Sequence, residues 1–394
     1  MKKLINNKEF LLLVFIALFG VSIGLFDNYR ELWMSYNNMS SITISHIISI
    51  SYIITVLVLF YFTIKVSTAK LKNGILVTLI LKMVTGTMLL CLNGTSYLFL
   101  MKLLMFFDIA FKQLIISSIY PLIMSIQKGD VIYTKKEVVM NIANKLGFLV
   151  VSVLLGRSIA GIVIDYNICL LFATVFLFLA FIVLINVDIS SNKKTRNLDL
   201  NKTIKYFQKN NVLCLYLVVC LIGGIAWSAM IGMPMLTLTE RLDFNPSKAS
   251  FFVLGMGILS NIMAMVIVKL LRHKNDHVNI IFKFGLRVVL YLLVFLLNNK
   301  IMLIMTFVYL LLSDSTYGFI FDSYFINKVD EKYALLMTVL KYAASLTGNA
   351  IGTFICGLIF NLEIRYLALP SLIIGVIHYG MCTILINKKN ELNC

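Results

Sequence analysis

The sequence predicts an all-α membrane protein with twelve transmembrane helices. The chain has 394 residues, of which 60% are hydrophobic and only 13% charged, whereas soluble domains carry about 25% charged residues. Mean hydropathy is +0.92. Apolar runs of about 20 residues, the length that crosses a bilayer as a helix, recur along the whole chain. These observations predict a multi-pass protein, and we expect it in the plasma membrane.

Polar and charged residues between the apolar runs set the limits of the expected helices. The opening "MKKLINNKEFLLLVFIALFG" imitates a secretory signal, but no small-x-small cleavage site follows, so we interpret it as the start of the first span. The twelve spans are expected near residues 9–36, 42–64, 74–92, 96–125, 137–160, 168–187, 211–237, 247–270, 279–297, 301–325, 332–360 and 364–386.

One long polar stretch, residues 186–211, separates six spans from six. We therefore expect an N-terminal six-helix bundle over 1–187, a basic cytoplasmic linker over 188–210 and a C-terminal six-helix bundle over 211–394. The fifth and eleventh spans also resemble each other at an offset of 196, which pairs Lys145 with Lys341, Gly156 with Gly352 and Gly161 with Gly357. Such a duplication is a recurrent plan of transporters, with the substrate site between the halves.

The net charge of +17 is explained by topology. With both termini in the cytoplasm, most Lys and Arg residues fall in the inner loops, as the positive-inside rule requires. Nucleic-acid binding is not indicated. The seven cysteines are scattered without a CxxC pair, and the four histidines show no metal-ligand spacing on one helix, so neither a metal nor a cofactor is expected.

Twelve spans in a six-plus-six arrangement, cytoplasmic ends and a basic central loop resemble the major facilitator superfamily. The loop between spans 2 and 3, "KVSTAKLKNG", is basic but lacks the Asp and the Arg pair of that family's Gly-x-x-x-Asp-Arg-x-Gly-Arg-Arg pattern. The fourth span offers Lys102 where the family often has Arg. The resemblance implies a non-enzymatic secondary transporter that acts as a monomer on a small-molecule substrate. It also implies coupling to protons and, from what members of the family commonly do, efflux as the direction.

Ionisable side chains inside the apolar runs mark the candidate site. A charge left on lipid costs about 2.5–3.5 kcal/mol at a helix centre, so these groups must face inward and pair or line water. In "FDNYREL", spacings of three and four place the charges on one helical face; the alternative is a helix that stops at Phe26 before a solvated outer loop. The expected cavity residues are Asp27, Arg30, Glu31, Asp108, Lys112, Asn141, Lys145, Trp227, Asp314, Asp322, Lys341, Ser345 and Asn349.

Within this set, Asp108 is expected to pair with Lys112 or Lys145. Lys82, near the end of the third span, is expected to snorkel or to form a structural pair, and Lys283 and Arg287 to snorkel. Four basic groups would suit a carboxylate or phosphate on the substrate, whereas the acids would suit a cation, and both possibilities stay open. Alternative functions are a non-transporting sensor or immunity protein on the same scaffold, or an importer of an anionic metabolite.

The basic-residue bias makes a topology prediction. Loops near Lys70, Lys135, Arg196 and Lys274 should be cytoplasmic, and those near Asn93, Asp165, Arg241, Asn298 and Arg365 external. In a cysteine-free background, a membrane-impermeant maleimide should label a cysteine at position 365 on intact cells and one at 135 only after permeabilisation. Labelling at 135 from outside would reverse the orientation.

Overall fold

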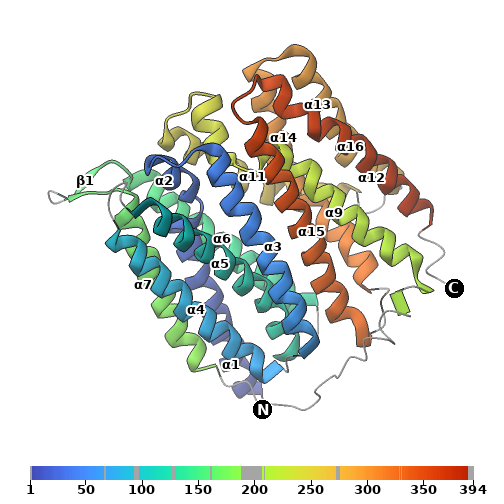
Figure 1. Cartoon of the computed structure of the whole chain (residues 1–394). Helices are drawn as coiled ribbons and strands as arrows, with labels where there is room; N and C mark the ends of the chain where they lie inside the picture. Colours follow the sequence, from blue (N-terminus) through green and yellow to red (C-terminus); the bar gives the residue numbers. More distant parts are fainter. Residues whose placement is uncertain are drawn as a thin grey trace. The chain divides into compact units, whose positions relative to one another are not determined.

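Each of the twelve expected spans overlaps a helix in the computed structural model (Figure 1). The structure describes residues 2–65, 68–92, 97–126, 130–159, 162–187, 206–207, 209–271, 276–327, 329 and 331–388. Within them, eight helices are long and apolar enough to cross a membrane. The linker expected over 188–210 lies almost entirely outside the described residues. The predicted all-helical membrane architecture is confirmed; a two-strand hairpin is the only addition in the described part.

The first of two compact units groups residues 1–40, 64–196 and 244–254. Its helix α1 packs against α6 and α7, and α4 packs against α5 and α7. Its elements are α1 (Lys2–Ser22), the π-helix η1 (Ile23–Asp27), α2 (Arg30–Tyr36), α4 (Thr68–Cys91), α5 (Leu98–Ile126), α6 (Asp130–Leu154), β1 (Ser158–Ile159), β2 (Ile162–Val163) and α7 (Tyr166–Ile185).

The second unit groups residues 41–63, 197–243 and 255–394. Its helix α9 packs against α15 and α16, and α13 packs against α14 and α16. Its elements are α3 (Ser41–Lys65), α9 (Asn211–Ile231), α10 (Pro234–Leu236), η3 (Thr237–Arg241), most of α11 (Pro246–Leu271), α12 (Asp276–Ile280), η4 (Ile281–Gly285), α13 (Leu286–Leu297), α14 (Lys300–Asn327), α15 (Glu331–Ile359) and α16 (Ile364–Asn387). The division of the chain by sequence at 187 and 211 stays a prediction.

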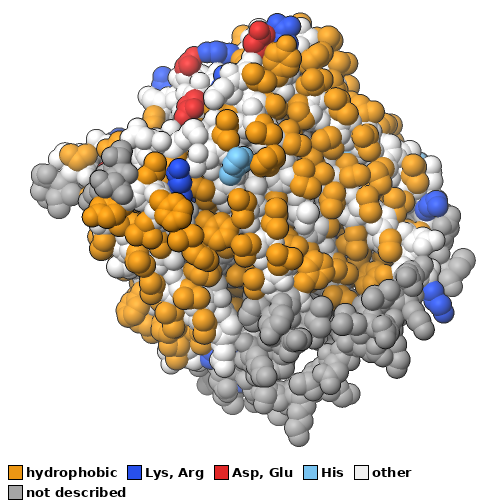
Figure 2. All heavy atoms as spheres, viewed as in Figure 1, with side chains coloured by type: hydrophobic (Ala, Val, Ile, Leu, Met, Phe, Trp, Pro, Cys, Tyr) orange, Lys and Arg blue, Asp and Glu red, His pale blue; other side chains and the backbone are white. Residues whose placement is uncertain are grey.

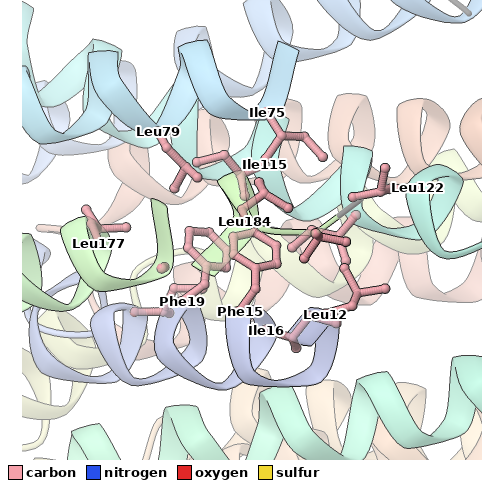
Figure 3. Close-up of a cluster of buried hydrophobic side chains, with 14 residues drawn as sticks. Leu12, Phe15, Ile16, Phe19, Ile75, Leu79, Ile115, Leu122, Leu177 and Leu184 are labelled. Atoms are coloured by element: carbon pink, nitrogen blue, oxygen red, sulfur yellow. The ribbon is translucent and has the colours of Figure 1, made fainter. Parts of the chain in front are cut away.

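Each unit encloses an apolar core while its outer helix faces remain hydrophobic. In the first unit, Phe15 and Phe19 of α1 meet Leu79 of α4, Ile115 of α5 and Leu177 of α7 (Figure 3). Hydrophobic side chains also cover most of the face seen in Figure 2. On α7 the exposed ones are Leu171, Phe172, Val175, Phe178, Leu179, Ile182 and Ile185. A helix that is apolar on all sides is suited to lipid outside and packing inside.

Glycines fix a close helix crossing in each unit. A Cβ added to Gly24 would lie 2.9 Å from the Cα of Gly147, where η1 crosses α6. In the second unit, a Cβ added to Gly348 of α15 would lie 3.1 Å from the Cα of Gly224 of α9. First and fifth spans of the two halves therefore cross alike, and small residues are what permit this approach.

These crossings correct the sequence repeat. The helix of the fifth span ends at Leu154 and not near residue 160, and Gly156 lies in a turn with φ of +79°. Gly352, its expected counterpart, lies within α15 against the backbone of α9. The offset of 196 therefore pairs a turn with a helix interior and is wrong. The crossing glycines instead match positions 147 and 348, an offset of 201.

The crossing makes a stability prediction. Gly24→Ala and Gly348→Ala should each lower the melting temperature of the purified protein, because a Cβ would meet backbone atoms at 2.2 Å and 2.1 Å, respectively. Overpacking of this kind costs about 1–3 kcal/mol. Gly380→Ala in α16 is the matched control, since its added Cβ meets nothing within 4 Å. Equal melting temperatures for all three variants would contradict the role of the crossings.

Candidate functional site

The first span is interrupted where its charges lie. Helix α1 ends at Ser22, the π-helix η1 covers Ile23–Asp27, and α2 begins at Arg30. Short π segments inside helices are frequent at functional sites. Asp27, Arg30 and Glu31 are only 5%, 6% and 8% exposed. The alternative of a solvated outer loop after Phe26 is therefore wrong, and the charges lie inside the helix bundle.

Side chains from neighbouring helices hold this interruption in place. The amide of Asn28 donates to the side-chain oxygen of Asn144 at 2.9 Å, and the hydroxyl of Tyr29 lies 2.8 Å from that of Ser152. The indole N–H of Trp33 donates to Asn167 at 3.0 Å. The Tyr29–Ser152 contact is buried and therefore costly to break, because breaking it leaves desolvated polar groups. The direction in which Asp27 and Arg30 point is thus fixed by α6 and by the start of α7.

Lys82 of α4 is the centre of a buried ion cluster. Its Nζ lies 2.6 Å from Oδ1 of Asp108 and 3.4 Å from Oδ1 of Asp27. Arg30 Nη1 lies 3.9 Å from the same oxygen of Asp27. Lys82 and Asp108 are 3% and 1% exposed. One ammonium therefore ties together three helices, α4, α5 and the broken first span, through two carboxylates.

The expected partner of Asp108 was wrong. Its carboxylate meets Lys82, whereas Lys112, one turn further along α5, makes no ion pair or hydrogen bond within the described part of the chain. Lys112 is nevertheless buried, and Asp27, Arg30, Lys82 and Asp108 all act on it electrostatically. We call these five residues, Asp27, Arg30, Lys82, Asp108 and Lys112, the ion cluster.

The ion cluster is incompletely hydrogen-bonded. Among the described residues, Oδ2 of Asp27, Oδ2 of Asp108, and Nε and Nη1 of Arg30 are buried without a hydrogen-bond partner. A cavity of about 10 Å³ lies beside Asp27, Lys82 and Asp108, which is about the room that one water molecule needs. Its other walls are Ser22, Phe26, Gly86, Leu170, Ala173, Thr174 and Leu177. Buried polar atoms of this kind call for an explanation, such as an ordered water or a functional role.

Two expected residues of α6 are not part of the cluster. Asn141 is exposed and Lys145 is half-buried, and neither makes an ion pair within the described residues. Asn144, which lies between them, is the α6 side chain that contacts the first span. The placing of Asn141 and Lys145 at a substrate cavity stays a prediction.

In the second unit, the expected residues of α9 and α15 lie at their crossing. The hydroxyl of Ser228 donates to Oδ1 of Asn349 at 3.0 Å, and the backbone oxygen of Ser345 faces Gly224. Trp227 is half-buried, and its indole N–H has no partner in the described part of the chain. Lys341 lies 5.6 Å from the ring centre of Tyr342. The side chains of Asp314 and Asp322 lie outside the described residues.

The second unit also contains buried cations, and Arg287 is one of them. Arg287 of α13 donates to the hydroxyl of Ser313 from Nε at 3.2 Å and from Nη2 at 2.9 Å, so the expected snorkelling is wrong. Lys82 and Asp108 are 26 residues apart, and so are Arg287 and Ser313. A shift of 205 maps one pair onto the other. Each unit thus carries a cation on its third span that reaches a polar group on its fourth, and this shared spacing was the available signal.

Several solved structures that resemble this chain are transporters. No family model and no curated protein matches the sequence. The nucleoside transporter NupG shares 12% identity, with 99% of this chain and 98% of that one covered, at a TM-score of 0.62. The peptide transporter POT in complex with sulfate shares 13% over 98% and 94%, at 0.66. A D-xylose–proton symporter shares 11% over 94% and 96%, at 0.67. The chain therefore has the fold of the major facilitator superfamily.

The Lys82–Asp108 contact makes a pairing prediction. Lys82→Met should strongly reduce the yield and melting temperature of the protein, because it leaves two carboxylates buried without their cation. Breaking a buried pair costs about 3–5 kcal/mol. The double variant Lys82→Met/Asp108→Asn should recover part of the loss, as coupled residues do.

Lys102→Met is the matched control for this cycle, since Lys102 lies on α5 and is only half-buried. It should be close to wild type. Strictly additive losses for Lys82 and Asp108 would show that the two side chains are not energetically coupled.

Proposed function

We propose that the protein is a secondary active transporter that moves a small polar or amphipathic solute across the plasma membrane by alternating access. The observation that carries the proposal is the ion cluster, which buries two carboxylates and three cations inside a bundle of membrane helices. The shared fold with nucleoside, peptide and xylose–proton transporters supports it. Action as a monomer, and efflux as the direction, belong to the proposal as expectations.

Stability alone does not account for such a cluster. Replacing buried ion pairs by well-packed apolar residues is often neutral or stabilising by about 1–4 kcal/mol. Charged residues within membrane spans generally mark substrate or ion pathways.

The cluster is suited to proton coupling. Protonation of Asp108 would remove the charge that holds Lys82 at 2.6 Å, and the ammonium would then be drawn toward Asp27 alone. A proton would thus be converted into a shift of α4 relative to α5 and the first span. In the proposed cycle this shift favours one of the two states, inward-open or outward-open, over the other. A proton can do this only if it binds the two states with different affinity.

A flux assay tests the proposal. The full chain is reconstituted into liposomes that enclose a pH-sensitive dye, and a compound library is screened for solutes that move protons. Nucleosides, peptides and pentoses come first, because proteins of the same fold carry them. A solute-dependent pH change that needs the protein supports transport. If no solute moves and no pH change occurs in protein that remains folded, the sensor alternative is favoured.

The coupling role predicts a separation of two activities. Asp27→Asn, Glu31→Gln or Asp108→Asn preserves size and hydrogen-bonding capacity but removes a titrating group. At least one should lose more than tenfold of pH-driven accumulation while solute exchange across the membrane remains measurable, since exchange moves no net protons. Asp243→Asn is the matched control, because that carboxylate is exposed and pairs with the exposed Lys300. Wild-type accumulation in all three variants would remove these acids from coupling.

A further inference from the structure

The ion cluster carries more positive than negative charge. Arg30, Lys82 and Lys112 supply three cations, and Asp27 and Asp108 supply two carboxylates; all five are less than 10% exposed. The adjacent Glu31 is equally buried, but within the described residues it forms no ion pair with Arg30 or Lys112. A buried, uncompensated charge in a membrane bundle is costly, so the excess calls for a counter-charge.

The excess is located on Arg30 and Lys112. Lys82 is engaged by both carboxylates, at 2.6 Å and 3.4 Å. Arg30 has only the 3.9 Å approach to Asp27, which is too long for a hydrogen bond, and its Nε and Nη1 have no acceptor in the described structure. Lys112 has no partner there either. Two cationic side chains, each more than nine-tenths buried, therefore have donors that no described protein group accepts.

We propose that Arg30 and Lys112 bind an oxyanion, a carboxylate or phosphate group of the transported solute. That this group belongs to a transported solute rests on the proposed transport function. The anion-binding site itself does not depend on that function. A guanidinium presents a planar fork of donors that matches two oxygens of such a group. Lys112 adds a point charge from α5. A halide offers no pair of oxygens to that fork, so oxyanions should bind better than chloride.

The arrangement also links the solute to the proton site. Arg30 approaches Asp27 only at 3.9 Å, and an oxyanion would compete with Asp27 for its guanidinium. Asp27 would then depend on Lys82 alone, and the balance between the two carboxylates around that lysine would change. Binding of the anionic group and protonation of a carboxylate would thus act on the same residues. Both cations are buried in this structure, so the site requires the opening that alternating access provides.

Thermal denaturation of the purified full chain in detergent tests the site. Sulfate, phosphate and acetate are added as sodium salts at pH 7 and compared with chloride at equal ionic strength. Each oxyanion that binds should raise the melting temperature by several degrees in a saturable manner, as any ligand of the folded state does. Phosphate and acetate separate the two chemical classes: a response to only one of them identifies the group.

Variants separate binding from a general salt effect. Arg30→Gln and Lys112→Gln should abolish the saturable shift, Lys112→Arg should retain it, and Lys102→Gln, on the same helix, should be unaffected. Because sulfate and phosphate stabilise many proteins by exclusion, a shift of equal size in wild type and in both Gln variants would overturn the proposal. If a Gln variant does not fold, saturable binding of radiolabelled sulfate, phosphate or acetate to wild type decides instead; absence of binding for all three overturns it.

The outcome is distinguishable from that of the transport proposal. Proton-coupled movement of an uncharged solute, without any oxyanion binding, would refute the anion site and leave transport standing. Saturable oxyanion binding that depends on Arg30 and Lys112, in a protein that moves no solute in liposomes, would support the site and refute transport.

Discussion

The burial of Lys82 is the interaction on which the rest of the first unit depends. A lone ammonium inside a membrane bundle is unfavourable, so the surrounding helices must supply negative charge within reach. Asp108 comes from the adjacent α5, but Asp27 comes from the first span, which must be broken to present it. The π-helix η1 and the turn at Asn28–Tyr29 therefore serve to bring the carboxylate of Asp27 within reach of the buried Lys82.

The close glycine crossing also helps to hold the interrupted first span in position. With η1 close enough to α6 for Gly24 and Gly147 to touch, the side chains of Asn28 and Tyr29 reach Asn144 and Ser152. A larger residue at the crossing would separate these pairs and loosen the interrupted segment. Backbone proximity, hydrogen bonding and the position of Asp27 are thus coupled, and the same type of crossing in the second unit supports an origin by duplication.

The sequence predicted the spans because lipid imposes a length and a composition that are visible residue by residue. It also predicted that Asp27, Arg30 and Asp108 are inside. It did not predict Lys82 as their partner, because Lys82 was placed near the end of its span, whereas it lies well inside α4 (Thr68–Cys91). Partner choice depends on how helices rotate against one another, and a single sequence does not contain that rotation. The repeat failed for a similar reason: Gly156 matched Gly352 in type but lies in a turn.

The two units differ at the positions that a shift of 205 residues makes equivalent, Lys82 and Asp108 in the first unit and Arg287 and Ser313 in the second. In the first, the cation of the third span meets a carboxylate, Asp108, that can gain or lose a proton. In the second, Arg287 meets the hydroxyl of Ser313, which does not titrate in the physiological range, and a guanidinium keeps its charge throughout. Protonation can therefore change the first contact and not the second. Within the proposed cycle, a duplicated fold would place the proton-sensitive contact in one half and keep the corresponding contact of the other half constant. In that cycle, protonation would change the contact in the first unit and leave the contact in the second unit unchanged. Two similar halves could then respond differently to the same proton.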